Sequence, residues 1–204
     1  MRVDGPVLAL GAHPDDVELG CGGTLARLVR EGVVCHVLTF TDCAASNGGA
    51  DMFAEAARAA QTIGVQIAGH LRLPVRELVS HRQAVADALV RVRDDLGPRC
   101  VLVHSATDVH QDHGVVAAEA RRIFRTATVL AYEAPWSAGR FAPGLFVRLS
   151  AQDVERKLAA LRAYESQAAR HYFADGPVLG QLAVRGAQIA CQHAEAFEVV
   201  RGIC

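Results

Sequence analysis

The sequence predicts an α/β fold of the Rossmann-like type, with a mostly parallel sheet and helices on both of its faces. Short apolar runs that suit buried strands alternate with helical segments of roughly 10–18 residues, which is typical of βαβ units joined by right-handed crossovers. The chain has 204 residues and a hydrophobic fraction of 51%. Because that length and composition suit one domain with its own core, we expect a single domain over residues 1–204.

The expected elements follow from hydrophobic periodicity and from the residues that end each run. The first strand, 7–12, is continuously apolar, and the helix 16–31 places Leu19, Leu25 and Leu28 on one side and stops at Gly32. Further strands are expected at 33–41, 65–73, 100–104, 129–133 and 145–149. Further helices are expected at 53–64, 79–96, 115–125, 154–164 and 182–195.

Composition and charge exclude several classes of protein. Lys and Arg number 21 against 22 for Asp and Glu, whereas a nucleic-acid surface needs a clustered positive excess. No apolar run reaches the roughly 20 residues of a membrane-spanning helix, and the first ten residues lack the features of a signal peptide. The six cysteines include no CxxC pair, so we expect reduced thiols in a cytoplasmic protein.

Two polar clusters follow two of the expected strands. The segment AHPDDVE at 12–18 follows the first strand, and DVHQDH at 108–113 comes shortly after the strand at 100–104. Ligands of parallel sheets bind beyond the carboxyl ends of the strands, so we expect both clusters at one edge of the sheet. Two His and one carboxylate form a standard ligand set for Zn²⁺, with water in the fourth position. The sequence therefore predicts a zinc site at that edge.

Each cluster also has a simpler interpretation when it is taken alone. Asp15 could cap the helix with Glu18 as its capping-box partner, and the segment 108–113 could be a polar loop. The Gly-rich stretch 20–23 lies inside an expected helix, where we expect close packing or a helix irregularity rather than a phosphate site. The remaining histidines have no ligand-like neighbours and are expected to be structural: His36, His70, His81, His104, His171 and His193.

At these two clusters the sequence resembles the PIG-L-like (LmbE-like) zinc-dependent N-deacetylases. The similarity rests on AHPDD at 12–16, the GCGGTL that follows, and HxDH at 110–113, with further agreement near Lys157, at 166–167 and at 185–197. The resemblance implies a Rossmann-like fold and hydrolysis of an N-acyl group, typically N-acetyl on a glucosamine-type sugar.

The resemblance also implies roles for individual residues. It implies that Asp15 is the general base. It implies that a protonated His110 stabilises the developing oxyanion and that Asp112 is oriented to hold the His110 imidazole. The zinc ligands that it implies are His13, Asp16 and His113.

Three positions depart from the family's usual pattern and concern the substrate rather than the metal. Many members carry Arg, Asp and His where this chain has Met52, Arg148 and Tyr164. Met52 removes a potential charge-assisted contact. The loop 135–143 carries the only Trp, Trp136, which could be a packing anchor or an aromatic platform. We therefore expect a neutral, partly apolar N-acetylated amino sugar or glycoconjugate as substrate.

Two other functions stay open at the level of sequence. A zinc amidase acting on a thiol-sugar conjugate would use the same residues, so only substrate profiling separates it from an N-deacetylase. A nucleotide-binding Rossmann-like module predicts stabilisation by nucleotides and no metal. We expect neither nucleic-acid nor membrane partners, and no sequence feature decides whether the chain forms a homo-oligomer.

Overall fold

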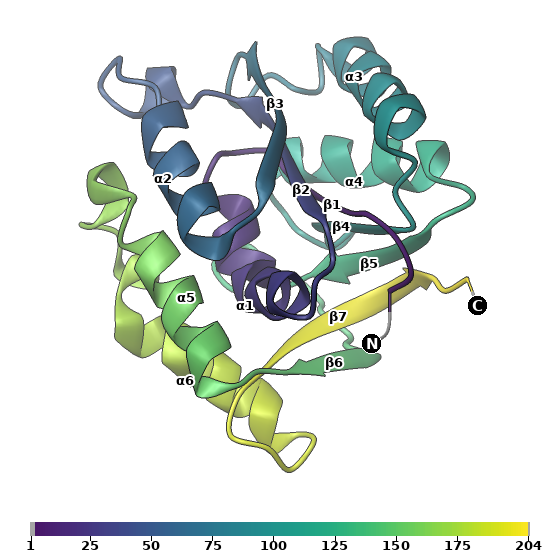
Figure 1. Ribbon diagram of the computed structural model, residues 1–204. Coiled ribbons are helices and arrows are strands. Elements are labelled where there is room, and N and C mark those ends of the chain that lie inside the picture. Colours follow the sequence, from purple (N-terminus) through teal and green to yellow (C-terminus); the bar gives the residue numbers. More distant parts are fainter. Residues whose placement is uncertain (1–2, 204) are drawn as a thin grey trace.

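The computed structural model describes residues 3–203, which form helices around one seven-stranded sheet (Figure 1). The strands are β1 (Val7–Gly11), β2 (Cys35–Thr41), β3 (Gln66–Leu73), β4 (Cys100–His104), β5 (Thr128–Tyr132), β6 (Leu145–Arg148) and β7 (Ala194–Arg201). The helices are α1 (Asp16–Arg30), α2 (Phe53–Ile63), α3 (Arg82–Leu96), α4 (Gln111–Ile123), α5 (Ala151–Leu161) and α6 (Asp175–Ala187). Short 3₁₀ helices are η1 (Ala44–Ser46), η2 (Glu165–Gln167) and η3 (His171–Phe173). The predicted fold class is confirmed.

The order of the strands determines where a ligand can bind. It is β3-β2-β1-β4-β5-β7-β6, and the first five strands in this order are parallel to one another. From β1 the chain builds outward to β2 and β3 on one side, and it then returns to place β4 and β5 on the other. The strand order therefore reverses between β1 and β4, and a crevice outside their carboxyl ends is the expected binding position in such sheets.

Helices cover both faces of the sheet, as predicted. Figure 1 shows α3 and α4 on one face and α1, α2, α5 and α6 on the other. All five residues of β1 are buried, and they alternate between two apolar clusters: Val7 and Ala9 join one, Leu8 and Leu10 the other. Because successive side chains of a strand point to opposite faces, a strand covered on both faces must be apolar throughout.

The Gly-rich stretch of α1 marks a kink in this helix, which confirms the predicted irregularity. Cys21 leaves the helical conformation, with φ −144° and ψ 18°. Gly20 packs so closely on the ring of Tyr132 that a Cβ there would lie 2.1 Å from a ring carbon. The kink separates the first turn of α1, which carries Asp16, from the rest of the helix.

A buried ion pair satisfies the backbone groups that the kink releases. Lys157 Nζ donates to the carbonyl oxygen of Leu19 and to Glu195 Oε1, each at 2.6 Å. The Glu195 carboxylate accepts from the backbone N–H groups of Gly23 at 2.9 Å and Thr24 at 2.6 Å. Both side chains of the pair are nearly fully buried. The only lysine in the chain thus joins α5, α1 and β7 at one point.

Two expected elements differ in the structure. Residues 194–195, expected at the end of a helix, begin β7, which pairs antiparallel with both β5 and β6. The helix before it, α6, spans Asp175–Ala187 rather than the expected 182–195. The turn that follows packs closely on Gly186, where a Cβ would lie 2.6 Å from the carbonyl oxygen of Cys191. The helix expected from residue 115 begins at Gln111, because the ring of His110 accepts the N–H of Asp112 and caps it.

Within residues 3–203 the structure has no membrane-spanning helix and no disulfide. None of its helices is both long and apolar enough to cross a bilayer. Its cysteines are free thiols, namely Cys21, Cys35, Cys43, Cys100 and Cys191. The sixth, Cys204, lies outside the described residues.

Candidate metal and catalytic site

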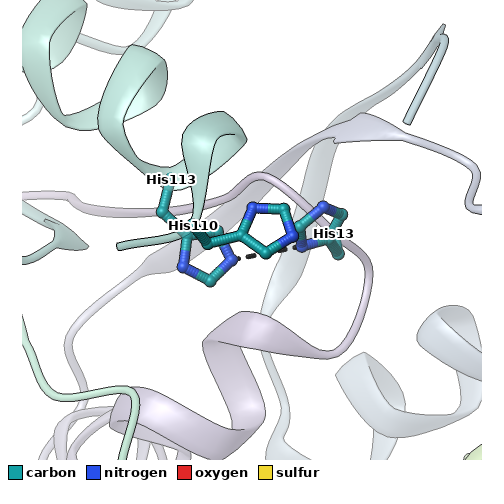
Figure 2. Close-up of side chains that lie close together, drawn as sticks. All are labelled: His13, His110 and His113. Atoms are coloured by element: carbon teal, nitrogen blue, oxygen red, sulfur yellow. Dashed lines mark hydrogen bonds between the residues drawn. The ribbon is translucent and has the colours of Figure 1, made fainter. Parts of the chain in front are cut away.

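The two polar clusters meet at the crevice between β1 and β4. His13 lies two residues beyond β1 and Asp16 opens α1, while His110 caps α4 and His113 lies in its first turn. Figure 2 shows the three imidazoles facing one another across this gap. The ring centroids of His13 and His113 are 5.1 Å apart, and those of His13 and His110 are 4.7 Å apart. The predicted co-location of the clusters is confirmed.

His13, Asp16 and His113 form a compact triangle in which each histidine meets a different oxygen of Asp16. His13 Nδ1 lies 3.1 Å from Asp16 Oδ2 and 3.2 Å from His113 Nε2, and His113 Nε2 lies 3.4 Å from Asp16 Oδ1. A tetrahedral zinc site with bonds of about 2.0–2.1 Å has ligand atoms roughly 3.3 Å apart. The donor types and their spacing therefore fit a zinc ion.

The cluster also offers other three-ligand sets. His13, His110 and His113 bring one nitrogen each within 4.8 Å of one another, as do the ligand atoms of Asp16, His104 and His113. His113 belongs to each of these sets. Geometry alone therefore identifies His113 as the common member and leaves the choice of its partners to chemistry.

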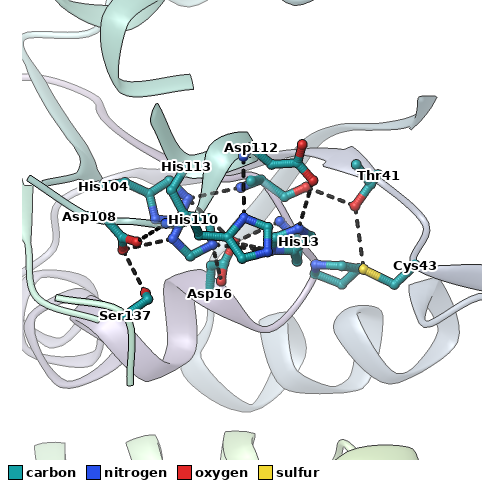
Figure 3. A network of polar contacts seen from close by, with 12 residues as sticks. His13, Asp16, Thr41, Cys43, His104, Asp108, His110, Asp112, His113 and Ser137 are labelled. Atoms are coloured by element: carbon teal, nitrogen blue, oxygen red, sulfur yellow. Dashed lines mark hydrogen bonds and ion pairs between the residues drawn. The ribbon is translucent and has the colours of Figure 1, made fainter. Parts of the chain in front are cut away.

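Carboxylates hold the far nitrogens of both histidines in the triangle (Figure 3). Asp108 Oδ2 lies 2.8 Å from His113 Nδ1, and Asp112 Oδ2 lies 3.2 Å from His13 Nε2. Asp108 itself accepts from Ser137 Oγ at 2.9 Å and from the N–H of His110 at 2.8 Å. Metal-binding histidines are commonly oriented by such carboxylates. The sequence placed Asp108 in the polar cluster without assigning it a role.

The expected contact between the Asp112 carboxylate and His110 is wrong. That carboxylate faces His13 instead, and it accepts the backbone N–H groups of Arg76 at 2.6 Å and Leu78 at 3.2 Å. It is the backbone N–H of Asp112 that meets His110, donating to Nδ1 at 3.2 Å. A neutral His110 ring that accepts at Nδ1 carries its proton on Nε2.

The imidazoles differ in pKa because they face different neighbours. Burial alone would lower the pKa of His113, but Asp16 and Asp108 raise it to about 9. Burial would also lower the pKa of His13, but Asp16 and Asp112 hold it well above the usual value. His110 has the opposite shift: burial and the neighbouring imidazoles lower its pKa. The protonated His110 expected from the resemblance is therefore not supported, and a neutral ring is.

The pKa values of the two adjacent aspartates, Asp15 and Asp16, also shift in opposite directions. Burial would raise the pKa of Asp16, but the imidazoles of His113, His13 and His104 hold it well below the usual value. The pKa of Asp15 is raised to about 6, first by burial and then by the charge of Asp16. Its side chain makes no helix-capping hydrogen bond, so the capping-box interpretation of Asp15 and Glu18 is wrong. The buried Asp15 carboxyl lines the same cavity as the metal cluster.

His104 is a member of this cluster that sequence reasoning treated as structural. Its Nε2 accepts the backbone N–H of Ala12 at 3.0 Å and lies 3.4 Å from Asp16 Oδ2, and its ring stacks on that of His113 at 3.8 Å. Burial, followed by the charge of His113, lowers its pKa to about 4. The available signal was its position, since His104 is the last residue of a central strand and side chains there border the ligand crevice.

The cluster opens into a cavity of about 430 Å³, large enough for a small sugar conjugate. The loop after β2 contributes Cys43 and Ser46 to its wall, and the loop 135–143 contributes Trp136. Met52 also lines the cavity. The other two departing positions do not, because Arg148 is exposed on β6 and Tyr164 is buried, donating to the carbonyl of Pro14. The further lining residues are His13, Asp15, Asp16, Val75, Arg76, His110, His113, Gln167, Arg170 and Tyr172.

Comparison with known proteins finds relatives of this sequence. The sequence profile of the GlcNAc-PI de-N-acetylase family, PIG-L, matches residues 8–124. The chain is 32% identical over 170 residues to the uncharacterized deacetylase YaiS of Escherichia coli, covering 78% of this chain and 90% of that protein. The family match over residues 8–124 includes both polar clusters.

Solved structures share the fold at lower identity. The N,N′-diacetylchitobiose deacetylase of Pyrococcus horikoshii superposes with a TM-score of 0.79 at 20% identity, covering 96% of this chain and 83% of that one. GalB, a 4-carboxy-2-hydroxymuconate hydratase from Pseudomonas putida, superposes with a TM-score of 0.78 at 17% identity, covering 98% of each chain. Because one fold serves a deacetylase and a hydratase, the fold alone does not choose the reaction.

Proposed function

The chain belongs to the GlcNAc-PI de-N-acetylase (PIG-L) family, and we propose that it is a zinc-dependent hydrolase that removes an N-acetyl group from an amino sugar or glycoconjugate. One observation carries the proposal: two histidines and one carboxylate converge at the edge of a cavity with a second, non-converging carboxyl beside them. This is the combination that metal-assisted amide hydrolysis needs.

We assign the metal to His13, Asp16 and His113. The support is the tetrahedral spacing of their ligand atoms and the carboxylates behind both rings. A bound Zn²⁺ supplies a Lewis acid for the amide oxygen and brings the pKa of a coordinated water close to 7. Asp108 and Asp112 orient the two imidazoles and balance the charge that a dication adds.

Asp15 is the proposed general base. It lies in the cavity and next to a proposed ligand, and its carboxyl is not used as a helix cap. It accepts a proton from the attacking water and returns it to the departing amine. A pKa near 6 before the metal binds suits a group that must both take and give a proton near neutral pH.

His110 is the proposed donor to the oxyanion, in its neutral form rather than as an imidazolium. The backbone N–H of Asp112 occupies Nδ1, which leaves an Nε2–H to donate to the acyl oxygen as it gains negative charge. Removing such a preorganised donor typically lowers the rate by roughly 10²–10³.

The test is the release of acetate and free amine from a panel of N-acetylated amino sugars and glycoconjugates. We expect equal amounts of both products, loss of activity after chelation, and recovery on adding about one equivalent of zinc. Asp15→Asn protein purified in the same way controls for contaminating enzymes. A zinc-loaded protein that releases no amine from any N-acetyl substrate would refute the proposal. Cleavage of thiol-sugar amides alone would favour the amidase.

A further inference from the structure

Two arginines line the cavity beside the metal cluster, and the first is held there in an unusual backbone conformation. Arg76 lies in the connection after β3 with φ +68°, a left-handed conformation that residues other than Gly seldom adopt. Its N–H donates to Asp112 Oδ2 at 2.6 Å, and its carbonyl accepts from Gln111 Nε2. The HxDH segment thus fixes Arg76 from both sides, as is common where backbone strain serves a site.

The second arginine approaches from the opposite end of the chain. Arg170 precedes η3, donates to the hydroxyl of Tyr172 at 2.8 Å and lies over its ring at 5.9 Å. It is close enough to Asp15 to influence that carboxyl electrostatically. Arg76 and Arg170 therefore border the cavity from two separate loops. The loop of Arg76 is hydrogen-bonded to α4, and Arg170 contacts the aromatic ring of Tyr172.

Neither guanidinium has a carboxylate partner within residues 3–203. Other arginines of the chain are paired, for example Arg30 with Asp153 and Arg185 with Glu133. The acidic side chains that line the cavity are Asp15, the proposed base, and Asp16, a proposed metal ligand. The carboxylates that would balance a bound dication, Asp16, Asp108 and Asp112, contact the imidazole cluster and do not pair with either guanidinium.

An aromatic pair adds an apolar surface to the cavity. Trp136 stacks on Tyr172 with ring centroids 4.7 Å apart and an interplanar angle of 12°. Both rings line the cavity, and Met52 adds a further apolar side chain. A sugar ring offers an apolar face to aromatic side chains and hydroxyls to polar ones, so a glycoside with a charged substituent matches this lining.

We infer that this site selects an N-acetylated amino sugar whose attached group carries an anion, a carboxylate or a phosphate, held by Arg76 and Arg170. The inference rests on the proposed function and replaces the neutral substrate that the sequence suggested. Met52 does remove an arginine that relatives use, but the sequence could not show that two others enter the cavity from loops far away in the chain. Guanidinium groups bind carboxylate and phosphate through paired, charge-assisted hydrogen bonds.

The test compares the carboxymethyl glycoside of N-acetylglucosamine with its primary amide, which has nearly the same shape and no charge. Binding is measured by calorimetry on zinc-loaded Asp15→Asn protein, and kcat/KM on the active enzyme. N-acetylglucosamine 1-phosphate forms a third arm that distinguishes phosphate from carboxylate. We expect an anionic ligand to bind about tenfold or more tightly than the amide.

Charge-removing variants assign this preference to the two arginines. In Arg76→Gln and Arg170→Gln, combined with Asp15→Asn, the ratio of anion to amide affinity should fall toward one. Arg91→Gln, an exposed change on α3, should leave the ratio as it is. Equal binding of acid, phosphate and amide would overturn the inference, as would a preference that survives both substitutions.

The same experiment separates this inference from the proposed function. Acetate release without a preference for anions would refute the anionic substrate and keep the deacetylase. Anion binding that depends on the arginines, without acetate release from any substrate, would keep the anionic ligand and refute the deacetylase.

Discussion

At the scale of single residues, the cluster is balanced by charge before any metal binds. Burial disfavours the charged forms of His13, His113 and Asp16. The pKa values of both histidines are nevertheless raised and that of Asp16 is lowered, because the imidazolium and carboxylate charges stabilise each other. A dication that displaced the two ring protons would meet the same carboxylates. We therefore expect binding of the metal to release protons from His13 and His113.

Asp15→Asn separates the catalytic interpretation from a structural one. Asn keeps the shape of the side chain but cannot accept the proton of water, so turnover should fall by roughly 10²–10⁴. Zinc content should be unchanged because Asp15 is not a proposed ligand. Acetate release and metal analysis measure the two effects. Activity within about tenfold of the wild type would contradict the assignment.

Asp108→Asn tests the carboxylate that the sequence left without a role. The contact of 2.8 Å to His113 Nδ1 would lose its charge, and zinc affinity should fall roughly 10- to 100-fold. Competition with a chromophoric chelator measures the dissociation constant. Asp94→Asn, on an exposed residue of α3, is the control. Equal affinity in the two variants would show that Asp108 does not support the metal.

At the scale of elements, the kink at Cys21 divides α1 into two parts with different roles. Its first turn presents Asp16 to the cluster, while its remainder packs beneath α5 at the position that Lys157 and Glu195 secure. A buried charge that loses its partner is costly, whereas replacing both members is often much less so. The ion pair therefore acts as one unit that holds the kink.

A double-mutant cycle measures that unit. Lys157→Met should lower the free energy of unfolding by about 3 kcal/mol or more, because Glu195 is left buried without its cation. The double variant with Glu195→Gln should be less destabilised than the two single changes together. Urea denaturation measures all three. The exposed Arg162–Asp175 pair is the comparison, and its loss should change stability by less than about 1 kcal/mol. A similarly small effect at Lys157 would refute this role.

Elements of strong local pattern could be predicted from the sequence, and those that depend on distant contacts could not. The apolar run of β1 and the polar residues after it identified both the strand and its functional end. The start of α4 was placed four residues late, because its cap is a histidine ring rather than one of the usual capping residues. Strand β7 was missed because its register depends on β5 and β6, not on its own sequence.

At the scale of the whole molecule, the topology of the sheet creates the site. Residues about 100 positions apart meet because β1 and β4 are adjacent and parallel, with the strand order reversing between them. This much followed from the sequence, as did the residues at the proposed metal. The two arginines of the cavity could not be predicted from the sequence, and neither could the contact of the Asp112 carboxylate with His13 instead of His110. Both depend on how loops fold over that edge.

Zinc should therefore stabilise the entire fold. At a free concentration 100 times its dissociation constant, a ligand that binds only the folded state adds about 2.7 kcal/mol. For a chain of this size that corresponds to a rise in Tm of roughly 5–10 °C. Thermal denaturation with and without zinc measures it. His113→Ala should show little of this rise, and an equal rise in that variant would place the metal elsewhere.

The position of the ion itself is the most direct test of the central claim. Anomalous diffraction from zinc-loaded crystals, recorded on both sides of the zinc absorption edge, locates the metal without reference to activity. We predict one site per chain, bonded to His13, Asp16 and His113, with Asp15 within reach of the water at the open position. A peak coordinated by His13, His110 and His113, or no peak at this edge of the sheet, would contradict the assignment.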